Sequence, residues 1–319
     1  MITVVLPTRN PDRERLDRSL QGLVVQALPR DDWELVVVDN GSAPAVADGK
    51  FPQMGCPIRV VREHRVGLTP ARLAGIHAAR GQVIVFVDDD NVLRSDYLAQ
   101  VARLFDGRPK LGAAGGPVIP EWEAPPPAWT HEFHGLLALR DLGPAIQIAP
   151  GGPNVPWPNF APVGAGMAIR REFAQAYAAA VIKDTRRKRL DRSGSSLASG
   201  GDNDLVFTTL HAGGDVGYFP DLQLTHLIPA GRLEPKYLGM LNRGIMRTWV
   251  QVLALHGQCP WPAIASRSVA LRATRAYLRA RAWRGPAERV RWAGMLGQFE
   301  GQAELSRTPR QYTGYLAHH

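Results

Sequence analysis

The sequence predicts an α/β protein with a mainly parallel central sheet, followed by a helical C-terminal region. Two observations carry this prediction. Short, continuously apolar runs alternate with segments of helical spacing over residues 1–120, and such runs are typical of parallel strands covered on both faces. Beyond Pro235 the pattern is helical. We therefore divide the chain into an α/β part, residues 1–230, and a helical region, residues 231–319.

Each expected element has a local signal in the sequence. Strands are predicted at 2–6, 33–38, 58–61, 83–87 and 163–169, and helices at 12–28, 69–79, 95–105 (with Ser95 as N-cap) and 171–182. In a sheet of this kind, ligands bind beyond the carboxyl ends of the strands. Asp39 and Asp88 each follow such a strand, so both are candidate site residues.

Two segments are expected to lack regular structure. Residues 117–164 are rich in proline, glycine and tryptophan, which predicts irregular loops that line a pocket. Residues 183–200 are first basic and then rich in serine and glycine, which predicts a mobile loop.

Composition indicates an ordinary globular protein of the reducing cytoplasm. The chain has 319 residues and only two cysteines, Cys56 and Cys259, whose separation matches no metal-binding spacing and indicates reduced thiols. We identify no signal peptide at the N-terminus. No apolar run approaches the roughly 20 residues that cross a bilayer. We expect a cytoplasmic protein that is soluble or peripheral at the inner face of the membrane.

The net charge of +9 is concentrated in two segments, 183–192 and 267–291, which points to anionic partners at particular places. Nucleic acid is not expected, because no helix-turn-helix, zinc-finger or RNP signature is present. Segment 183–192 is either a lid over a diphosphate or a solvated loop. Segment 267–291 predicts a basic amphipathic helix, which either contacts an anionic membrane and a lipid-linked acceptor or packs with its arginines in solvent.

The strongest chemical signal is the triplet Asp88-Asp89-Asp90 directly after the apolar strand 83–87. Adjacent carboxylates repel each other, and a hard divalent cation offsets that repulsion. Mg²⁺ or Mn²⁺ held by one or two carboxylates commonly completes its coordination with diphosphate oxygens. The alternative is a solvated acidic turn.

Four segments, in order along the chain, resemble those of family 2 glycosyltransferases with the GT-A fold, a Rossmann-like fold. They are Val4–Asn10, Val36–Ser42, Gly67–Gly81 and Asp88–Asp90. One departure is Leu73, which stands where the family often has asparagine. The resemblance covers residues 1–230, and the ordered set is far more specific than any single block.

The resemblance implies a nucleoside diphosphate sugar donor, linked to UDP or dTDP. The nucleotide-binding residues it implies are Pro7, Thr8, Arg9, Asp39, Arg72, Asp88 and Asp89. Asp39 would accept a hydrogen bond from the base imide, Arg72 would lie near phosphate, and Asp90 would be the main metal ligand. Asp39 as a turn residue and Arg72 as a surface arginine remain the alternatives.

The second half of the chain supplies the acceptor side of the resemblance. Ser199–Leu205 resembles the block Gly-Glu-Asp-x-x-Leu, with Gly201 where the family often has glutamate. This implies that Asp202 is the general base, with Asp204 as the fallback and a helix N-cap as the alternative for Asp202. His226 would be a second metal ligand or a structural histidine.

These residues predict a metal-dependent inverting glycosyltransferase of the hexosyltransferase type. It would move a sugar to an acceptor hydroxyl on a glycan, a lipid-linked molecule or a small molecule, while one carboxylate takes the hydroxyl proton. A sugar nucleotidylyltransferase is disfavoured, because no glycine-rich loop follows the first strand. The other alternative is a carbohydrate- or nucleotide-binding protein with a decayed site, which the intact triplet and Asp202 argue against.

Overall fold

The computed structural model describes residues 1–46, 51–194 and 196–306. Its central sheet has eight strands in the order β3-β2-β1-β4-β9-β6-β12-β8. These strands are β1 (Ile2–Thr8), β2 (Trp33–Asp39), β3 (Ile58–Arg62), β4 (Val83–Phe86), β6 (Leu111–Gly115), β8 (Gln147–Ala149), β9 (Ala168–Arg170) and β12 (Asp215–Tyr218). Strand β9 is antiparallel to both neighbours and β8 is antiparallel to β12, whereas the other paired strands are parallel. The prediction of a mainly parallel sheet is confirmed.

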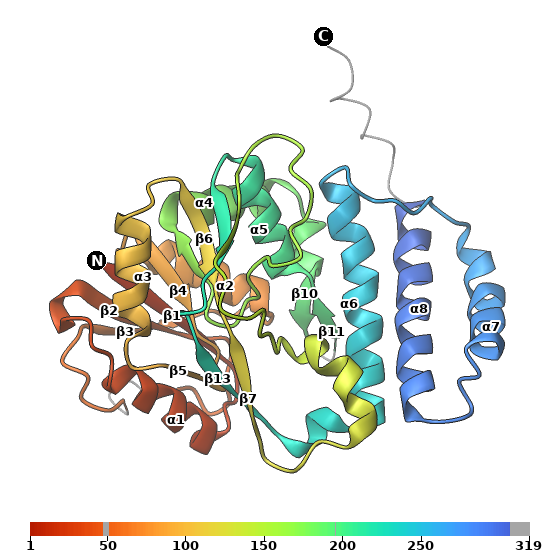
Figure 1. Cartoon of the computed structure of the whole chain (residues 1–319), viewed down its shortest axis with the longest axis horizontal. Helices are drawn as coiled ribbons and strands as arrows, with labels where there is room; N and C mark the ends of the chain where they lie inside the picture. Colours follow the sequence, from red (N-terminus) through yellow and green to blue (C-terminus); the bar gives the residue numbers. More distant parts are fainter. Residues whose placement is uncertain (47–50, 195, 307–319) are drawn as a thin grey trace, which may run out of the picture.

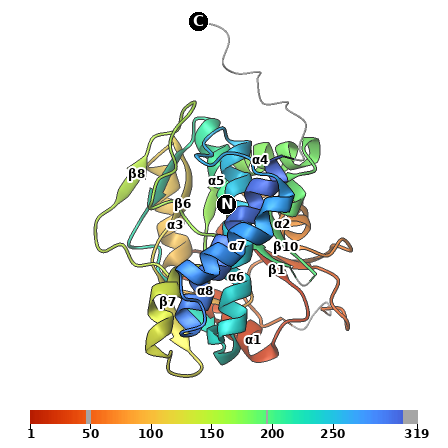
Figure 2. The ribbon, with the colours of Figure 1, turned by 90° about the vertical axis from the view of Figure 1, so that its right-hand side faces the viewer.

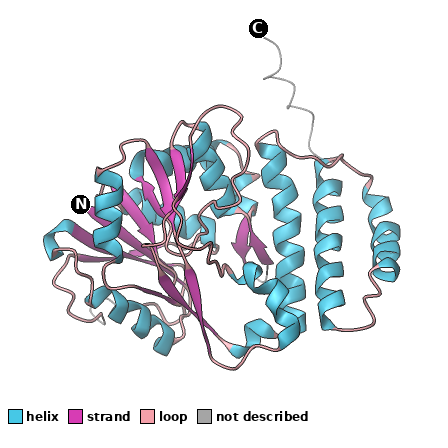
Figure 3. Ribbon diagram, in the orientation of Figure 1, coloured by secondary structure: helices cyan, strands magenta, loops and turns pink. Residues whose placement is uncertain are grey.

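Helices cover both faces of this sheet (Figure 3). Helices α1 (Arg13–Val24) and α3 (Tyr97–Asp106) pack on one face, and α2 (Leu68–Ala78), α4 (Arg171–Lys183) and α5 (Gly201–His211) pack on the other. The sequence explains α1 directly. Asp12 caps it by accepting the Arg15 N–H at 3.1 Å, and the leucines at helical spacing form its buried face.

The structure corrects several local predictions. The strand expected at 163–169 is limited to β9, Ala168–Arg170. The N-cap of α3 is Asp96, not Ser95. Residues 117–164 contain β7 (Val118–Trp122), the 3₁₀ helix η2 (Ala128–Leu137) and β8. Residues 183–200 contain η3 (Arg187–Arg189) and a hairpin of β10 (Asp191–Ser193) and β11 (Ser196–Ser199), with residue 195 outside the described part. These short strands pair with partners distant in sequence or are polar, so local periodicity does not reveal them.

A second, three-stranded sheet connects the aspartate triplet to the second half of the chain. Its order is β5 (Asn91–Leu93), β13 (Leu224–Ile228) and β7. In the antiparallel pairing of β13 with β5, His226 stands opposite Asn91, and the Leu227 N–H donates to the Asp90 carbonyl at 2.9 Å. This pairing brings His226 beside a triplet that lies far from it in sequence.

The C-terminal region is helical, as predicted. Helices α6 (Pro235–Leu255), α8 (Pro286–Leu305) and α7 (Val269–Arg279) follow one another outward from the sheet (Figure 1), and Figure 2 turns α8 and α7 toward the viewer. The remaining 3₁₀ turns are η1 (Arg30–Asp32), η4 (Ala230–Leu233) and η5 (Ser266–Ser268). Residues 307–319 of the predicted helical region lie outside the described part. Among the described residues, no helix combines the length and hydropathy that crossing a bilayer requires.

Close contact between α6 and α8 depends on glycine at position 297. A Cβ there would lie 2.1 Å from the backbone oxygen of Arg243 on α6. We expect Gly297→Ala to lower the free energy of unfolding by about 1–3 kcal/mol, because the two helices must separate. Gly239→Ala on α6 is the matched control, since its Cβ would meet its nearest neighbour at 3.7 Å. Urea unfolding measures both, and an unchanged stability of Gly297→Ala would contradict the close packing.

Candidate active site

The sequence-predicted site residues converge on one cavity. It has a volume of about 350 Å³ and lies beyond the carboxyl ends of β1 and β4. Nine of the predicted residues line it: Pro7, Thr8, Arg9, Arg72, Asp88, Asp89, Asp90, Asp202 and His226. They come from five separate stretches of chain, so the fold and not the sequence order brings them together.

The end of β1 forms one wall because β1 extends further than β4. The register between the two strands stops at Val5 opposite Phe86, whereas β1 continues beside β2 as far as Thr8. Pro7 and Thr8 are therefore paired on one side only and face the cavity on the other. The missing N–H of Pro7 leaves no unpaired donor at this edge.

Asp89 is the member of the triplet that contacts β1. The Thr8 hydroxyl donates a hydrogen bond to its carboxylate. Burial, together with the neighbouring charges of Asp88 and Asp90, nevertheless raises the pKa of Asp89 to about 6. This contact gives Asp89 a structural partner on β1.

The other two aspartates have pKa values shifted in opposite directions. Burial and the charge of Asp90 raise the pKa of Asp88. Burial also acts to raise the pKa of Asp90, but the contacts with His226 and the charge of Arg232 outweigh it and hold that pKa well below its ordinary value. Asp90 is thus the member held ionised by its surroundings.

Asp90 forms a compact group with His226 and Arg232. The Arg232 guanidinium donates from Nη2 to Asp90 Oδ2 at 2.8 Å, and its Nη1 lies 3.0 Å from His226 Nε2. His226 Nδ1 lies 3.1 Å from the Leu137 carbonyl, which suits a tautomer with the proton on Nδ1 and a lone pair on Nε2. Asp90 Oδ2 and His226 Nε2 are 3.4 Å apart.

Asp90 and His226 both line the cavity and offer an oxygen and a nitrogen of the types that divalent cations accept. In this structure the Arg232 guanidinium contacts both atoms, so a cation held by this pair would have to displace it. No cluster of three or more histidine, cysteine, aspartate or glutamate side chains with metal-binding geometry occurs among the described residues. A cation here would need its remaining ligands from water or a diphosphate, as Mg²⁺ and Mn²⁺ commonly do.

Asp39 is placed differently from the other predicted residues. It is 1% exposed, and its two carboxylate oxygens accept backbone N–H bonds from Ser42 at 2.9 Å and Val46 at 3.1 Å. The cavity wall at this point is Asn40, whose Oδ1 accepts the Gly67 N–H at 2.8 Å. In this structure Asp39 therefore makes the contacts of a turn-forming residue.

Arg72 is buried in the cavity wall, not on the helix surface. Its guanidinium lies 3.5 Å from the carboxylate of Asp191 and 5.6 Å from the centroid of the Phe86 ring. Burial acts to lower the pKa of Arg72, but the charges of Asp191, Asp202 and Asp88 outweigh it and raise that pKa. This arginine therefore supplies fixed positive charge among the carboxylates.

Asp202 enters the cavity from the first turn of α5. Its Oδ2 accepts the Gly164 N–H at 3.0 Å, and its Oδ1 accepts the Asn203 N–H at 2.9 Å. A Cβ at position 164 would lie 2.4 Å from Arg72 Nη2 and 3.2 Å from Asp202 Oδ2. The glycine is thus required for the close approach of these two side chains. The N-cap of α5 is Gly200, so Asp202 does not occupy the N-cap position itself.

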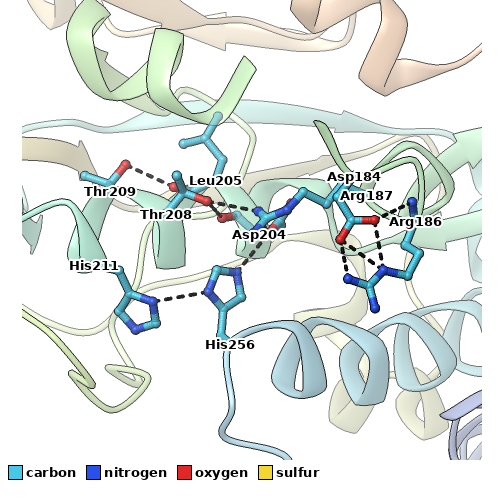
Figure 4. Close-up of polar contacts among 9 residues, drawn as sticks. All are labelled: Asp184, Arg186, Arg187, Asp204, Leu205, Thr208, Thr209, His211 and His256. Carbon is cyan, nitrogen blue, oxygen red and sulfur yellow. Dashed lines mark hydrogen bonds and ion pairs between the residues drawn. The ribbon is translucent and has the colours of Figure 1, made fainter. Parts of the chain in front are cut away.

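Asp204, the fallback base, belongs to a different cluster (Figure 4). It is fully buried and accepts hydrogen bonds from Arg187 and, at 2.8 Å, from His256 Nε2. His256 in turn lies 3.3 Å from His211, Nδ1 to Nδ1. These contacts join η3, α5 and the end of α6. Asp204 therefore has a structural role, and it is not among the residues that line the cavity.

Two residues of the basic segment have roles that the sequence did not reveal. Asp191 is 3% exposed, and besides contacting Arg72 it accepts the Gly201 N–H at 3.1 Å and the Thr69 hydroxyl at 3.2 Å. Arg192 lines the cavity. The excess charge of residues 183–192 was the available signal, but it did not distinguish these two from their solvated neighbours.

The cavity also receives side chains from the second half of the chain. Arg232 on η4 and Tyr237 on α6 line it, as do residues 136–138 at the end of η2. Four arginines and four aspartates line the cavity altogether. A bound diphosphate would add negative charge to this balanced set, and a divalent cation would compensate for it. The geometry therefore suits an anionic ligand, with the acidic residue Asp202 beside Arg72 in the cavity wall.

The mainly parallel sheet with a charged cavity at its strand ends is the arrangement of an α/β ligand-binding protein, and comparison with known proteins identifies the family. Residues 3–177 match the family described as glycosyl transferase family 2. This match covers more than half of the chain, so the protein belongs to that family. Its mixed α/β architecture is the GT-A fold, with helices added at the C-terminus.

The chain is similar to several characterised relatives. It is 26% identical over 235 residues to the succinoglycan biosynthesis protein ExoM of Rhizobium meliloti, covering 71% of this chain and 67% of the relative. It is 23% identical over 146 residues to the glucosyl-dolichyl phosphate glucuronosyltransferase of Haloferax volcanii, covering 44% and 46%. It is 36% identical over 75 residues to the protein EpsH of Bacillus subtilis, covering 23% and 22%. The chain thus spans less than half the length of two of these three.

Solved structures support the fold. The structure of GalNAc-T7 with UDP, GalNAc and Mn²⁺ superposes with a TM-score of 0.55 at 15% identity, covering 95% of this chain and 56% of that one. At this identity the similarity establishes the fold alone.

The raised pKa of Asp89 predicts a dependence of stability on pH. The pKa of Asp89 is about 6 in the folded protein, whereas an unfolded aspartate has a pKa of ~3.9. The protonated side chain's contribution to the free energy of unfolding is therefore fully present below about pH 4 and is lost as pH rises through about 6. We expect Asp89→Asn, which keeps a neutral acceptor for Thr8, to be more stable than the wild type at pH 8 by about 1–3 kcal/mol. The difference should be smaller at pH 4.

Urea unfolding at the two pH values in a metal chelator measures this. A difference between wild type and Asp89→Asn that stays the same at pH 4 and pH 8 would contradict the assignment.

Proposed function

We propose that this protein is an inverting, metal-dependent glycosyltransferase that moves a hexose-type sugar from a nucleoside diphosphate to an acceptor hydroxyl. The observation that carries the proposal is the convergence of the Asp90–His226 pair and the Asp202 carboxylate on one cavity. The first can hold a cation on the diphosphate, and the second can take a proton on the acceptor side. Catalysis is assigned to residues 1–230, and residues 231–319 support the cavity through Tyr237.

The donor side would be bound by the end of β1, Arg72 and the triplet. Pro7, Thr8 and Arg9 are proposed to contact the nucleotide, together with Asp88 and Asp89. UDP is the favoured nucleotide, in line with the UDP and Mn²⁺ named for GalNAc-T7, and dTDP is the alternative. Asp39 is proposed to act on the base indirectly, through the turn that it holds at Ser42.

The transfer itself is proposed to be a direct displacement at the anomeric carbon. Asp202, held by two backbone N–H bonds, would accept the proton of the acceptor hydroxyl as the new bond forms. The charges of Arg72 and Arg192 act to lower the pKa of Asp88, against the larger effects of burial and of Asp90. When bound, Mg²⁺ or Mn²⁺ would neutralise the leaving diphosphate, and Asp90 and His226 are the residues that would hold it.

The acceptor is proposed to carry a free hydroxyl on a lipid-linked glycan. The name of the Haloferax relative, which specifies a dolichyl phosphate-linked sugar, supports this acceptor over a small molecule. The location proposed is the cytoplasm, with a peripheral contact at the inner face of the membrane.

Metal dependence can be tested by calorimetry with UDP. We expect Mn²⁺ to raise the affinity of the wild type for UDP by roughly tenfold or more, because the cation links Asp90 to the diphosphate. Asp90→Ala should lose this enhancement, and Asp17→Ala, at an exposed position on α1, should keep it. A wild-type affinity that ignores Mn²⁺ would refute the metal site.

The base assignment has a separate test. Asp202→Asn should bind UDP with Mn²⁺ as the wild type does and lose transfer by roughly 10²–10⁴-fold, because proton acceptance is removed and donor contacts are not. Asp204→Asn is the matched control, and we expect it to lower stability through its buried cluster while retaining transfer. Donor consumption in the presence of acceptor measures both. An active Asp202→Asn with an inactive Asp204→Asn would move the base to Asp204.

A further inference from the structure

Helix α7 exposes an apolar and basic face at the outer edge of the molecule. Leu271, Leu278 and Trp283 have exposed fractions of 54%, 58% and 56%. Helix α7 packs on α8, which separates it from α6, and Figure 2 shows α7 at the front of this helical layer. Large apolar side chains on the outward face of a packed helix indicate an interaction surface when they occur together.

The inner face of α7 already has its packing partner, so the outward leucines are not a second core. Ala273 is buried against α8, where the Trp292 indole N–H donates to its carbonyl at 2.9 Å. Tyr277 contacts the Trp292 ring edge to face, with centroids 5.3 Å apart. At about 100° per residue, Leu271 and Leu278 lie within about 20° of each other and on the side opposite Ala273.

Positive charge surrounds these leucines. The segment from η5 to the end of the following turn contains six exposed arginines: Arg267, Arg272, Arg275, Arg279, Arg281 and Arg284. No acidic residue occurs in the sequence between Glu234 and Glu288. None of the six forms an ion pair with a carboxylate among the described residues. The charge of this face is therefore available to an external anion.

We propose that this face of α7, with the turn that carries Trp283, binds an anionic lipid surface. The leucines and the indole would enter the headgroup region, and the arginines would extend to the lipid phosphates, as long basic side chains do at such interfaces. Alternating arginine and leucine on one face fits a charged interface better than a protein partner, whose contact core is depleted of charge. This inference deepens the proposed peripheral location and does not depend on the transfer reaction.

Sedimentation of the full chain with lipid vesicles tests the proposal. We expect binding to phosphatidylcholine vesicles that contain about one third phosphatidylglycerol, weakened by added salt, and little binding to phosphatidylcholine alone. The double variant Arg275→Gln, Arg279→Gln should bind roughly 30-fold more weakly. Its matched control is Arg13→Gln, Arg103→Gln, two exposed arginines on α1 and α3 at the opposite end of the molecule in Figure 1.

A second pair of variants tests the contribution of the apolar side chains to vesicle binding. Leu271→Ser with Leu278→Ser should weaken vesicle binding by roughly tenfold or more, whereas Ile182→Ser, at a residue 70% exposed on α4, should not. An unchanged circular dichroism spectrum shows that each variant is folded. Equal binding to neutral vesicles, an equal loss in the control variants, or a dimer dispersed by Leu271→Ser would overturn the proposal. Failure of UDP binding in the wild type would refute the proposed function without affecting this result.

Discussion

Mutual repulsion among buried carboxylates is the constraint on which the rest of the site depends. Burial acts to raise the pKa of Asp88, Asp90 and Asp191. Asp191, Asp202 and Asp88 all act on the same arginine, Arg72. The fold offsets this repulsion by placing arginine side chains beside the carboxylates. Arg72 lies between Asp191 and Asp202, and Arg232 lies on Asp90. Such an arrangement leaves little net charge, so a polyanionic ligand and a cation would enter together.

Asp191 connects the two halves of the site. Its carboxylate bonds to the first residue of α5, to Thr69 on α2 and to Arg72. A Cβ at position 201 would lie 2.1 Å from Asp191 Oδ2, so the glycine at the start of α5 makes room for this carboxylate. The next residue is Asp202. The hairpin thus fixes the helix turn that carries the proposed base, and the basic segment is a structural part of the cavity wall as well as its border.

The helical region supports the site from one side and faces outward on the other. Tyr237 on α6 lines the cavity, and α6 is held to α8 through glycine contacts that allow the helices to approach closely. Helix α7 rests on α8 through small residues and one tryptophan. This layering separates the cavity from the arginine-rich face by two helix spacings, or about 16–20 Å.

The sequence by itself determined the parallel strands, the helical C-terminal region and most of the candidate site. This was possible because β-branched runs, helical spacing and residues at strand ends are local features, and nine of the ten named site residues line the cavity. Only the tertiary structure decided the rest. The β13–β5 pairing placed His226 and Arg232 at Asp90, and the β10–β11 hairpin buried Asp191 against Arg72. The tertiary structure also placed Asp39 in a turn and Asp204 in a separate cluster. These outcomes depend on contacts between residues far apart in the chain, and no periodicity within a segment encodes such contacts.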